Sequence, residues 1–353
     1  MKKFSNEQQP TAIDLFSGSG GLTCGIKQAG FKVIGAVELD DTASQSYLLN
    51  HPEVHLWQQD ITTLTSDEIM KTLNLKSGEL DLLAGCPPCQ GFSYMRTKNR
   101  RQPVDDPRNN LIKQFYRLVE DLNPKTVMLE NVPGLNDDNR LQDFCDMLKR
   151  NGYHYKKDIL DVSNYGVPQR RKRLILLASR LHPIDFIDPD IPKVTVRDTI
   201  EKLPKSGTSG DKLHDIRIKF TPKVQEIIKL IPKNGGSRRN LDEEYQLPCH
   251  KKNNGFKDVY GRMKWDDVSP TITGGCNSPS KGRFLHPEED REITLREASL
   301  LQTFPPDYKF SLDRGKSKVA LMIGNALPPK FIKYHAKTLL DNIRGVGINE
   351  NHR

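Results

Sequence analysis

The chain has 353 residues, a length that favours one large domain and one smaller domain. With 35% hydrophobic and 28% charged residues, its composition is typical of a soluble globular protein. Its 54 Lys and Arg residues against 45 Asp and Glu residues give a net charge of +9, which is too small to identify a partner class. No segment approaches the ~18 consecutive apolar residues of a membrane span, and the opening MKKFSNEQQP lacks the apolar stretch of a signal peptide. We therefore expect a cytoplasmic protein without a membrane partner, and we take it to be a monomer.

Segments of strand character alternate with segments of helical character through the first half of the chain. Short apolar runs with β propensity occupy residues 12–16, 32–37, 54–58, 79–85 and 125–131. Helical segments lie between them, at 22–30, 41–51 and 110–122. This alternation predicts an α/β fold in which a mostly parallel sheet carries helices on both faces. Ligands bind such sheets beyond the carboxyl ends of the strands, where the sequence places a glycine loop, Glu38, Asp60, Cys89 and Glu130.

The glycine loop SGSGG, which follows the first strand, indicates the kind of ligand. Gly18-x-Gly20 is similar to the start of a dinucleotide-binding fingerprint, but Thr23 stands where the third glycine belongs, and there is no phosphate-binding G-x-x-x-x-G-K-[ST] motif. Glu38, about twenty residues further on, is placed to accept hydrogen bonds from ribose hydroxyls. These features favour a nucleoside-bearing cofactor that lacks a diphosphate, and S-adenosylmethionine fits that description.

Two cysteines, Cys86 and Cys89, flank two prolines in the stretch GCPPCQGFS. A redox pair, half of a zinc site and a single nucleophile are the three interpretations. A structural zinc ion usually needs four ligands, and no second C-x-x-C or paired-histidine motif is present, so no metal site is expected. The prolines, with Gly91 soon after, favour an extended loop over the helix start of a redox motif. The residues by themselves disfavour these two interpretations without eliminating them.

After Ala178 the alternation of strands and helices fades. Residues 180–193 are rich in proline and are interpreted as a linker. Clusters of turn-forming residues follow at 233–240, 250–255 and 273–283. A helical run at 330–343 is expected to return to the first domain.

Six short motifs together resemble the DNA cytosine-5 methyltransferases of bacterial restriction-modification systems. They occur in the usual order of that family and span residues 14 to 329: DLFSGSGGLTCGIKQAGF, GCPPCQGFS, ENVPG, QRRKRLILLA, REITLREASLLQTFP and GNALPP. The resemblance implies a Rossmann-like, S-adenosyl-L-methionine-dependent catalytic and cofactor-binding domain at 1–180. It further implies a smaller, irregular target-recognition domain at 181–290 and a C-terminal segment, 291–353, that returns to the catalytic domain. The cofactor-binding residues that it implies are Phe16, Gly18, Gly20, Gly21, Leu22, Glu38, Leu39, Asp60, Ile61 and Asn325.

The resemblance also implies a set of catalytic residues. Cys89 matches the thiol that attacks carbon-6 of cytosine, so that carbon-5 can accept a methyl group. A free thiol is only slightly ionised at neutral pH and needs a positive environment or a base. Glu130 matches the glutamate that binds ring nitrogen-3 and the exocyclic amine. Arg171 and Arg173 match a Q-x-R-x-R pattern whose first arginine is implied to hold the base near its carbonyl oxygen, whereas Cys86 is interpreted as a small buried filler.

The implied substrate is double-stranded DNA, from which the target cytosine must be flipped out. Two basic stretches flank the catalytic motifs, with seven Lys and Arg in 94–117 and eight in 149–173. The candidate DNA contacts are Gln90, Ser93, Arg238 and Arg239, the last two in a flexible loop. A functionally paired restriction endonuclease is a possible partner. Two alternatives stay open, a transfer RNA cytosine-5 methyltransferase built on the same motifs and a non-catalytic DNA-binding regulator.

Overall fold

The computed structural model describes residues 9–88, 111–246 and 258–346, which form two compact units. The first unit comprises the chain up to Asp161, Lys172–Pro189 and the segment from Pro329 onward. The second comprises Val162–Arg171 and Asp190–Pro328. The polypeptide therefore leaves the first unit twice and returns to it twice.

The first unit is built on a seven-stranded sheet with the strand order β3-β2-β1-β4-β5-β7-β6. The parallel group consists of β1 (Thr11–Leu15), β2 (Lys32–Val37), β3 (His55–Trp57), β4 (Leu82–Gly85) and β5 (Thr126–Asn131). β7 (Lys172–Ser179) runs antiparallel between β5 and β6 (His154–Asp161). Every residue of β5 is buried, as expected for a strand covered on both faces. The predicted α/β fold with a mostly parallel sheet is confirmed.

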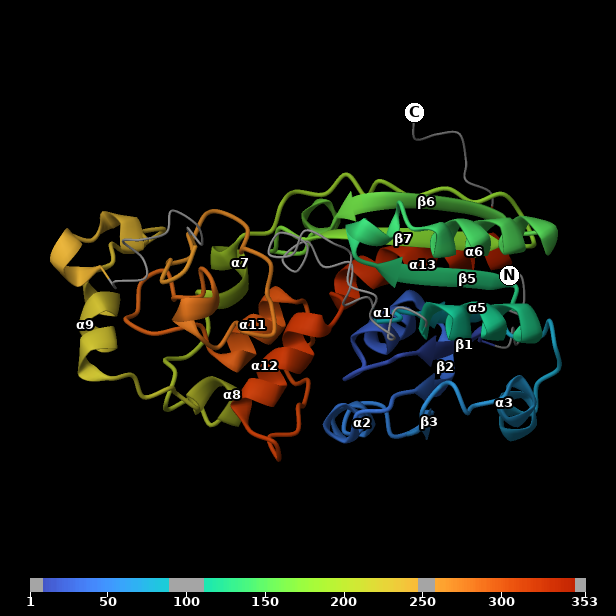
Figure 1. Cartoon of the computed structure of the whole chain (residues 1–353), viewed down its shortest axis with the longest axis horizontal. Coiled ribbons are helices and arrows are strands. Elements are labelled where there is room, and N and C mark those ends of the chain that lie inside the picture. Colours follow the sequence, from blue (N-terminus) through green and yellow to red (C-terminus); the bar gives the residue numbers. More distant parts are fainter. Residues whose placement is uncertain (1–8, 89–110, 247–257, 347–353) are drawn as a thin grey trace, which may run out of the picture. The chain divides into compact units, whose positions relative to one another are not determined.

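Helices cover both faces of this sheet. In Figure 1, α5 (Leu111–Leu122) and α6 (Asn139–Arg150) lie in front of it and α13 (Pro329–Ile343) lies behind it. α1 (Gly21–Ala29) packs against α13. Gly25 permits this close approach, because a Cβ atom there would lie 2.5 Å from the carbonyl oxygen of Pro329.

Two further helices follow strands at the other end of the sheet. α2 (Asp41–Leu48) begins where the Asp40 carboxylate accepts a hydrogen bond from the amide of Ala43. α3 (Ser66–Leu73) begins in the same way at Thr65, and Ile69 is its one buried residue. The sequence patterns did not predict α3, α6, β6 or β7. In β6 the reason is that an edge strand carrying mostly polar residues lacks the apolar run that marks a buried strand.

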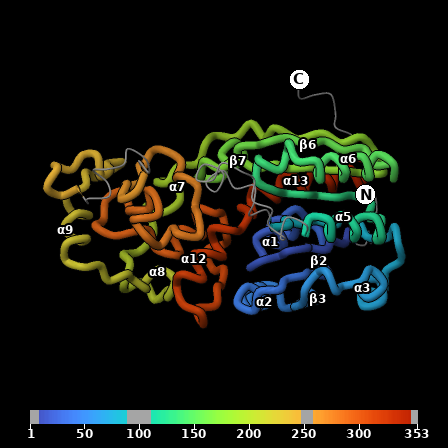
Figure 2. Tube along the Cα trace, in the orientation of Figure 1, coloured from blue at the N-terminus to red at the C-terminus, as the bar shows by residue number. Residues whose placement is uncertain are grey.

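The second unit contains short helices joined by long irregular stretches, as the trace in Figure 2 shows. Its α-helices in the described ranges are α7 (Val196–Ile200), α8 (Lys212–Asp215), α9 (Pro222–Leu230), α11 (Leu295–Leu301) and α12 (Lys316–Asn325). In these irregular stretches a buried arginine side chain supplies hydrogen bonds to backbone carbonyl groups. The fully buried guanidinium of Arg262 donates to the carbonyl oxygens of Ile228, Ile231 and His286.

The expected return of residues 291–353 to the first unit has a different boundary in the structure. Residues 291–328 belong to the second unit, where α11 packs against α7, α8 and α12. Only the segment from Pro329 onward belongs to the first unit. Two of these partners, α7 and α8, lie far earlier in the chain than α11, a pairing that local sequence patterns do not report.

Candidate active site and cofactor loop

The glycine loop turns sharply at the carboxyl end of β1. Phe16 and Gly18 have φ angles of 62° and 54°, in the left-handed region. For Phe16 this conformation costs on the order of 1–3 kcal/mol, and such strain is concentrated at functional sites. Gly20, with φ of 93°, precedes α1 at its N-terminus, where no side chain caps the helix. The loop therefore presents backbone amides at the edge of the sheet where a ligand is expected.

Glu38, at the end of β2, holds this loop in place. Its Oε2 accepts a hydrogen bond of 2.8 Å from the amide of Gly18, and its Oε1 accepts one of 2.8 Å from the amide of Asp40. Burial raises the pKa of Glu38 above its ordinary value. The neighbouring Leu39 is 64% exposed, which makes it an apolar surface beside the carboxylate. The position of Glu38 at this edge was predicted from the sequence, but its hydrogen bonds to the amides of Gly18 and Asp40 were not.

Asp14, inside β1, is a buried carboxyl group that is not among the predicted site residues. Its Oδ2 accepts a 2.6 Å hydrogen bond from the hydroxyl of Thr23, which also contacts the hydroxyl of Tyr47 at 2.9 Å. Oδ1 is buried and has no hydrogen-bond partner among the described residues. Burial raises the pKa of Asp14 to about 7. The visible signal was an aspartate within the apolar run AIDLF.

Replacing Asp14 by asparagine should remove a pH dependence of folding stability. Because the native pKa of about 7 exceeds the ordinary value of 3.8, the folded chain retains a proton that the unfolded chain releases. The resulting stabilisation is fully present below pH 3.8 and is lost as the pH rises to about 7. Relative to Asp14→Asn, the wild type should lose on the order of 1–4 kcal/mol across this interval. Urea unfolding of both proteins as a function of pH measures the difference, and parallel pH curves would contradict the assignment.

Two other predicted cofactor residues follow β3. Asp60 is exposed, and its Oδ1 accepts a hydrogen bond of 2.9 Å from the amide of Thr62, which lowers the pKa of Asp60. Ile61 is 4% exposed and belongs to the main apolar core of the first unit. Leu22 in α1 is likewise 4% exposed. Any contact of Ile61 or Leu22 with a cofactor would therefore involve mainly the backbone, whereas the Asp60 carboxylate remains accessible.

Glu130, at the end of β5, is the centre of the candidate active site. It is only 2% exposed, and its Oε1 lies 2.8 Å from Nε of Arg173 in an ion pair. The register explains this contact. Glu130 is directly opposite Ile175 in the antiparallel pair, so Arg173 is its diagonal neighbour on the same face of the sheet.

The thiol of Cys86 contacts the same carboxylate from another side. Its Sγ donates to Oε2 of Glu130 at 2.7 Å, and its side chain is partly exposed. The interpretation of Cys86 as a buried filler is therefore wrong. Its backbone amide donates to the carbonyl oxygen of Leu15, and Asn131 donates to the carbonyl oxygen of Pro87. These bonds attach the start of the cysteine loop to the ends of β1 and β5. Cys89, Gln90 and Ser93 lie outside the described residues.

The structure assigns different surroundings to the two arginines of the Q-x-R-x-R pattern. Arg171 is 4% exposed and belongs to the second unit, where its Nη1 donates to the carbonyl oxygens of Ile272 and Gly324. Arg173 is thus the arginine that forms an ion pair with Glu130, and which of the two arginines holds the base stays a prediction. The alternation of side chains along a strand would place Arg171 and Arg173 on the same face. Only Arg173 lies in the strand, however, because β7 begins at Lys172.

Three predicted residues of the second unit lie on short elements. Arg238 and Arg239 belong to a 3₁₀ turn, Arg238–Asn240, and not to the flexible loop that was expected. Arg238 is only 6% exposed, whereas Arg239 is exposed. Burial therefore leaves Arg239 the better placed of the two for a DNA contact. Asn325 ends α12 and is exposed, and its contact with a cofactor stays a prediction.

No helix among the described residues is long and apolar enough to cross a membrane. The described residues also contain no cluster of three or more His, Cys, Asp or Glu side chains that could hold a metal ion.

Comparison with known proteins identifies close relatives over nearly the whole chain. The pattern of the C-5 cytosine-specific DNA methylases matches residues 11–341. The Type II methylase M.HgiDII of Herpetosiphon aurantiacus is 35% identical over 349 residues, which cover 95% of this chain and 96% of that protein. The Type II methyltransferase M1.HphI of Haemophilus parahaemolyticus is 34% identical over 339 residues, which cover 94% of this chain and 86% of that protein.

A solved structure from Escherichia coli, described as a prophage-encoded DNA modification methyltransferase, is 26% identical and superimposes with a TM-score of 0.69. The match covers 95% of this chain and 99% of that one. The six motifs, the mostly parallel sheet and these matches agree with one another. The chain therefore belongs to the C-5 cytosine-specific DNA methylases, and it is a DNA cytosine-5 methyltransferase.

Proposed function

We propose that this enzyme transfers a methyl group from S-adenosyl-L-methionine to carbon-5 of a cytosine flipped out of duplex DNA. The observation that carries the proposal is the Glu130 site. A buried carboxylate is paired with Arg173 and contacted by Cys86, which precedes Cys89 by three positions in the sequence. The glycine loop follows β1 and the cysteine loop follows β4, and these parallel strands are hydrogen-bonded neighbours. Both loops therefore leave the same edge of the sheet.

The residues around the glycine loop fit a cationic nucleoside cofactor. Glu38 offers carboxylate oxygens that retain acceptor capacity for ribose hydroxyls, and the exposed Leu39 offers an apolar surface for a purine. The buried Oδ1 of Asp14 has no partner among the described residues and is a further unsatisfied polar atom in the strand that leads into the loop. S-adenosyl-L-methionine would supply the electrophilic methyl group.

Cys89, Glu130 and Arg173 then have separate roles toward the base. The Cys89 thiolate adds to carbon-6 of cytosine, and carbon-5 then uses the gained electron density to bond to the methyl carbon while the bond from that carbon to the sulfonium sulfur breaks and a neutral thioether leaves. Loss of the carbon-5 proton to water and departure of the thiolate restore the aromatic ring and the free enzyme. Glu130 binds nitrogen-3 and the exocyclic amine, where a shared proton offsets the charge created by thiolate addition. Arg173 orients Glu130 and reaches toward the carbonyl oxygen of the base.

Glu38→Ala should weaken binding of S-adenosyl-L-methionine. The variant loses the acceptor for the ribose and also releases the amide of Gly18, so we expect a loss of ~1.5–3 kcal/mol in binding free energy. Asp60→Ala should cost less, because Asp60 is exposed and solvent screens its interactions. Calorimetric titration of each purified variant measures these effects. Unchanged affinity in Glu38→Ala would exclude the glycine loop as the cofactor site.

A direct assay tests the proposed activity. The purified chain is incubated with methyl-labelled S-adenosyl-L-methionine and with either duplex DNA or transfer RNA. We expect labelled 5-methylcytosine in the DNA. Label in transfer RNA alone would establish the RNA enzyme instead, and cofactor-independent DNA binding without label in either substrate would indicate a non-catalytic regulator.

The second unit and the cellular context complete the proposal. We assign target recognition to the second unit, since the first contains the cofactor loop and Glu130. M.HgiDII and M1.HphI are both named as Type II enzymes, which supports a functionally paired restriction endonuclease.

A further inference from the structure

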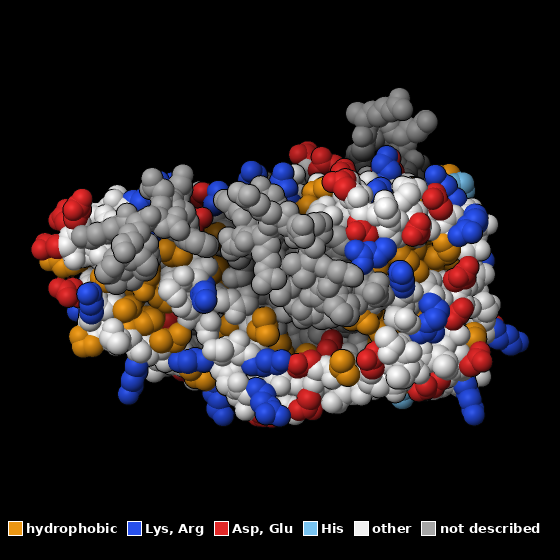
Figure 3. Space-filling view, viewed as in Figure 1, with side chains coloured by type: hydrophobic (Ala, Val, Ile, Leu, Met, Phe, Trp, Pro, Cys, Tyr) orange, Lys and Arg blue, Asp and Glu red, His pale blue; other side chains and the backbone are white. Residues whose placement is uncertain are grey.

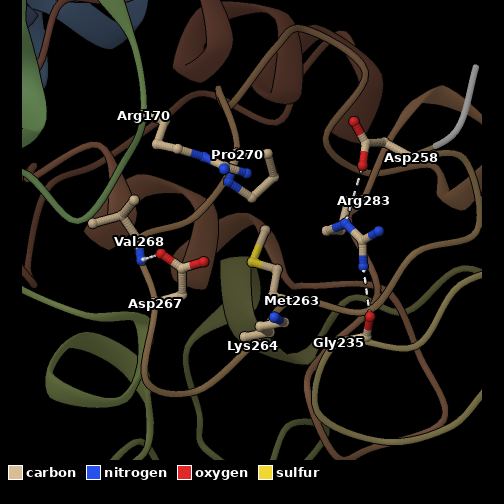
Figure 4. Close-up of a pocket in the computed structure, with 9 residues that line it drawn as sticks. All are labelled: Arg170, Gly235, Asp258, Met263, Lys264, Asp267, Val268, Pro270 and Arg283. Atoms are coloured by element: carbon tan, nitrogen blue, oxygen red, sulfur yellow. Dashed lines mark hydrogen bonds and ion pairs between the residues drawn. The ribbon is translucent and has the colours of Figure 1, made fainter.

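The second unit contains a half-open cavity of about 290 Å³. Its lining combines apolar and charged side chains, drawn in Figure 4. Met263 and Val268 are buried and form an apolar floor, whereas Arg170, Lys264 and Asp267 are exposed at the cavity. This size and this mixture of few polar groups on an apolar base are typical of a ligand subsite.

One charged pair at the cavity is committed to holding the structure together. Nη1 of Arg283 donates to the carbonyl oxygens of Gly235 and Gly236, at 2.9 and 3.2 Å. Its Nε binds the carboxylate of Asp258 at 3.1 Å, and Figure 4 shows this pair on one side of the cavity. Because these groups already satisfy one another, they are not available to a ligand without loss of the local fold.

The groups on the other side of the cavity are not committed in this way. Arg170 and Lys264 form no ion pair with any carboxylate in the described ranges. Asp267 uses Oδ1 to accept a 2.7 Å hydrogen bond from the amide of Val268, and Oδ2 receives no donor from the described residues. A planar guanidinium and a carboxylate oxygen therefore line one cavity without binding one another.

The presence of Asp267 decides between two kinds of DNA contact. A phosphate subsite is built from cations and amide donors, and an unpaired carboxylate in it would repel the ligand. A base-pair edge needs donors and acceptors together. In the major groove, guanine offers the acceptors O6 and N7, and its cytosine partner offers the N4 amino donor. Arginine is the commonest partner of guanine there, and a carboxylate accepts from cytosine N4.

We propose that this cavity reads one G·C pair of the recognised DNA sequence, with Arg170 bound to guanine and Asp267 bound to its cytosine. This inference rests on the proposed DNA-methylating function and adds a specificity site to it. Lys264, whose stem lies against Gly235, adds positive charge beside this pair and favours the approach of DNA.

Two variants and a control test the proposal in the full-length enzyme. Arg170→Ala removes the guanine contact. Asp267→Asn keeps an oxygen for the amide of Val268 but presents an amide donor toward the donor of cytosine. Lys223→Ala removes an exposed charge of α9 that does not line the cavity. Each protein methylates a pool of duplexes with randomised sequence, the methylated sites are sequenced, and cofactor affinity is measured separately.

We expect Arg170→Ala and Asp267→Asn to reduce discrimination at the same position, each by about tenfold or more, with cofactor affinity retained. Lys223→Ala should keep the wild-type preference. If Arg170→Ala weakened methylation of all sequences alike and lowered the salt slope by about one unit, Arg170 would be a phosphate contact and the proposal would be overturned. Unchanged preference in both variants would overturn it as well. A wild type that methylates no duplex would overturn the proposed function together with this site, so the two failures are distinguishable.

Discussion

Cys89→Ser will abolish methyl transfer. A serine hydroxyl has almost no anionic form near neutral pH and is a far weaker nucleophile than a thiolate, so the covalent step at carbon-6 cannot proceed at a useful rate. We expect a loss of several orders of magnitude in turnover, as is found when other enzymes lose their nucleophile. Initial rates with labelled cofactor and duplex DNA measure the loss. Duplex containing 5-fluorocytosine should trap the wild type covalently and leave Cys89→Ser free. Fluorine stands in place of the carbon-5 proton, and without loss of that proton the Cys89 sulfur cannot leave carbon-6.

Cys86 supplies the matched control for this experiment. Cys86→Ser should retain most activity, because the hydroxyl can still donate to Oε2 of Glu130. Cys86→Ala removes the donor and should be the less active of the two. If Cys86→Ser and Cys89→Ser lost activity equally, a joint role of both thiols, as in a redox pair or a metal site, would replace the single nucleophile.

Glu130→Gln will bind the cofactor normally and lose turnover. The amide has nearly the same shape as the carboxylate and fits the same space beside Arg173, so the fold around β5 should persist. It cannot exchange a proton with nitrogen-3 of the base, and groups with that role contribute about 10²–10⁴-fold to a rate. Single-turnover kinetics together with calorimetric titration of the cofactor separates the two effects.

Arg173→Ala tests the contribution of the ion pair with Glu130. It should also lower turnover while leaving cofactor affinity unchanged, because it removes the ion pair that orients Glu130. Full activity in Glu130→Gln would exclude Glu130 from catalysis. Full activity in Arg173→Ala, with loss in a variant of Arg171, would assign the base contact to Arg171, the first arginine.

The distribution of charged side chains on the surface gives little indication of where DNA binds. In Figure 3, Lys and Arg side chains are interspersed with Asp and Glu on the part of the face that is not grey. Several basic residues of the stretch 149–173 already have partners. Lys156 pairs with Asp185, and Lys157 donates to Asn136. The count of basic residues in this stretch therefore overestimates the positive charge available to DNA.

The sequence by itself determined the parallel part of the sheet and the residues at its edge. β2 occupies the predicted residues 32–37, β1 lies one residue earlier than predicted, and β5 begins one residue later than predicted. Periodicity succeeds here because buried parallel strands are continuous apolar runs that end abruptly at glycine or polar residues. The same boundaries place Glu38 and Glu130 at strand ends.

The tertiary structure alone decided which side chains meet there. The antiparallel register of β5 and β7 brings Arg173, and not Arg171, to Glu130, and the path of the chain after β4 brings the Cys86 thiol to the same carboxylate. Long-range packing also determines that Arg238 is buried and that residues 291–328 belong to the second unit. Local patterns report how a segment alternates between apolar and polar residues. They contain no information on which distant segment covers it, and that long-range packing determines whether a charged side chain is buried, paired or available to a substrate.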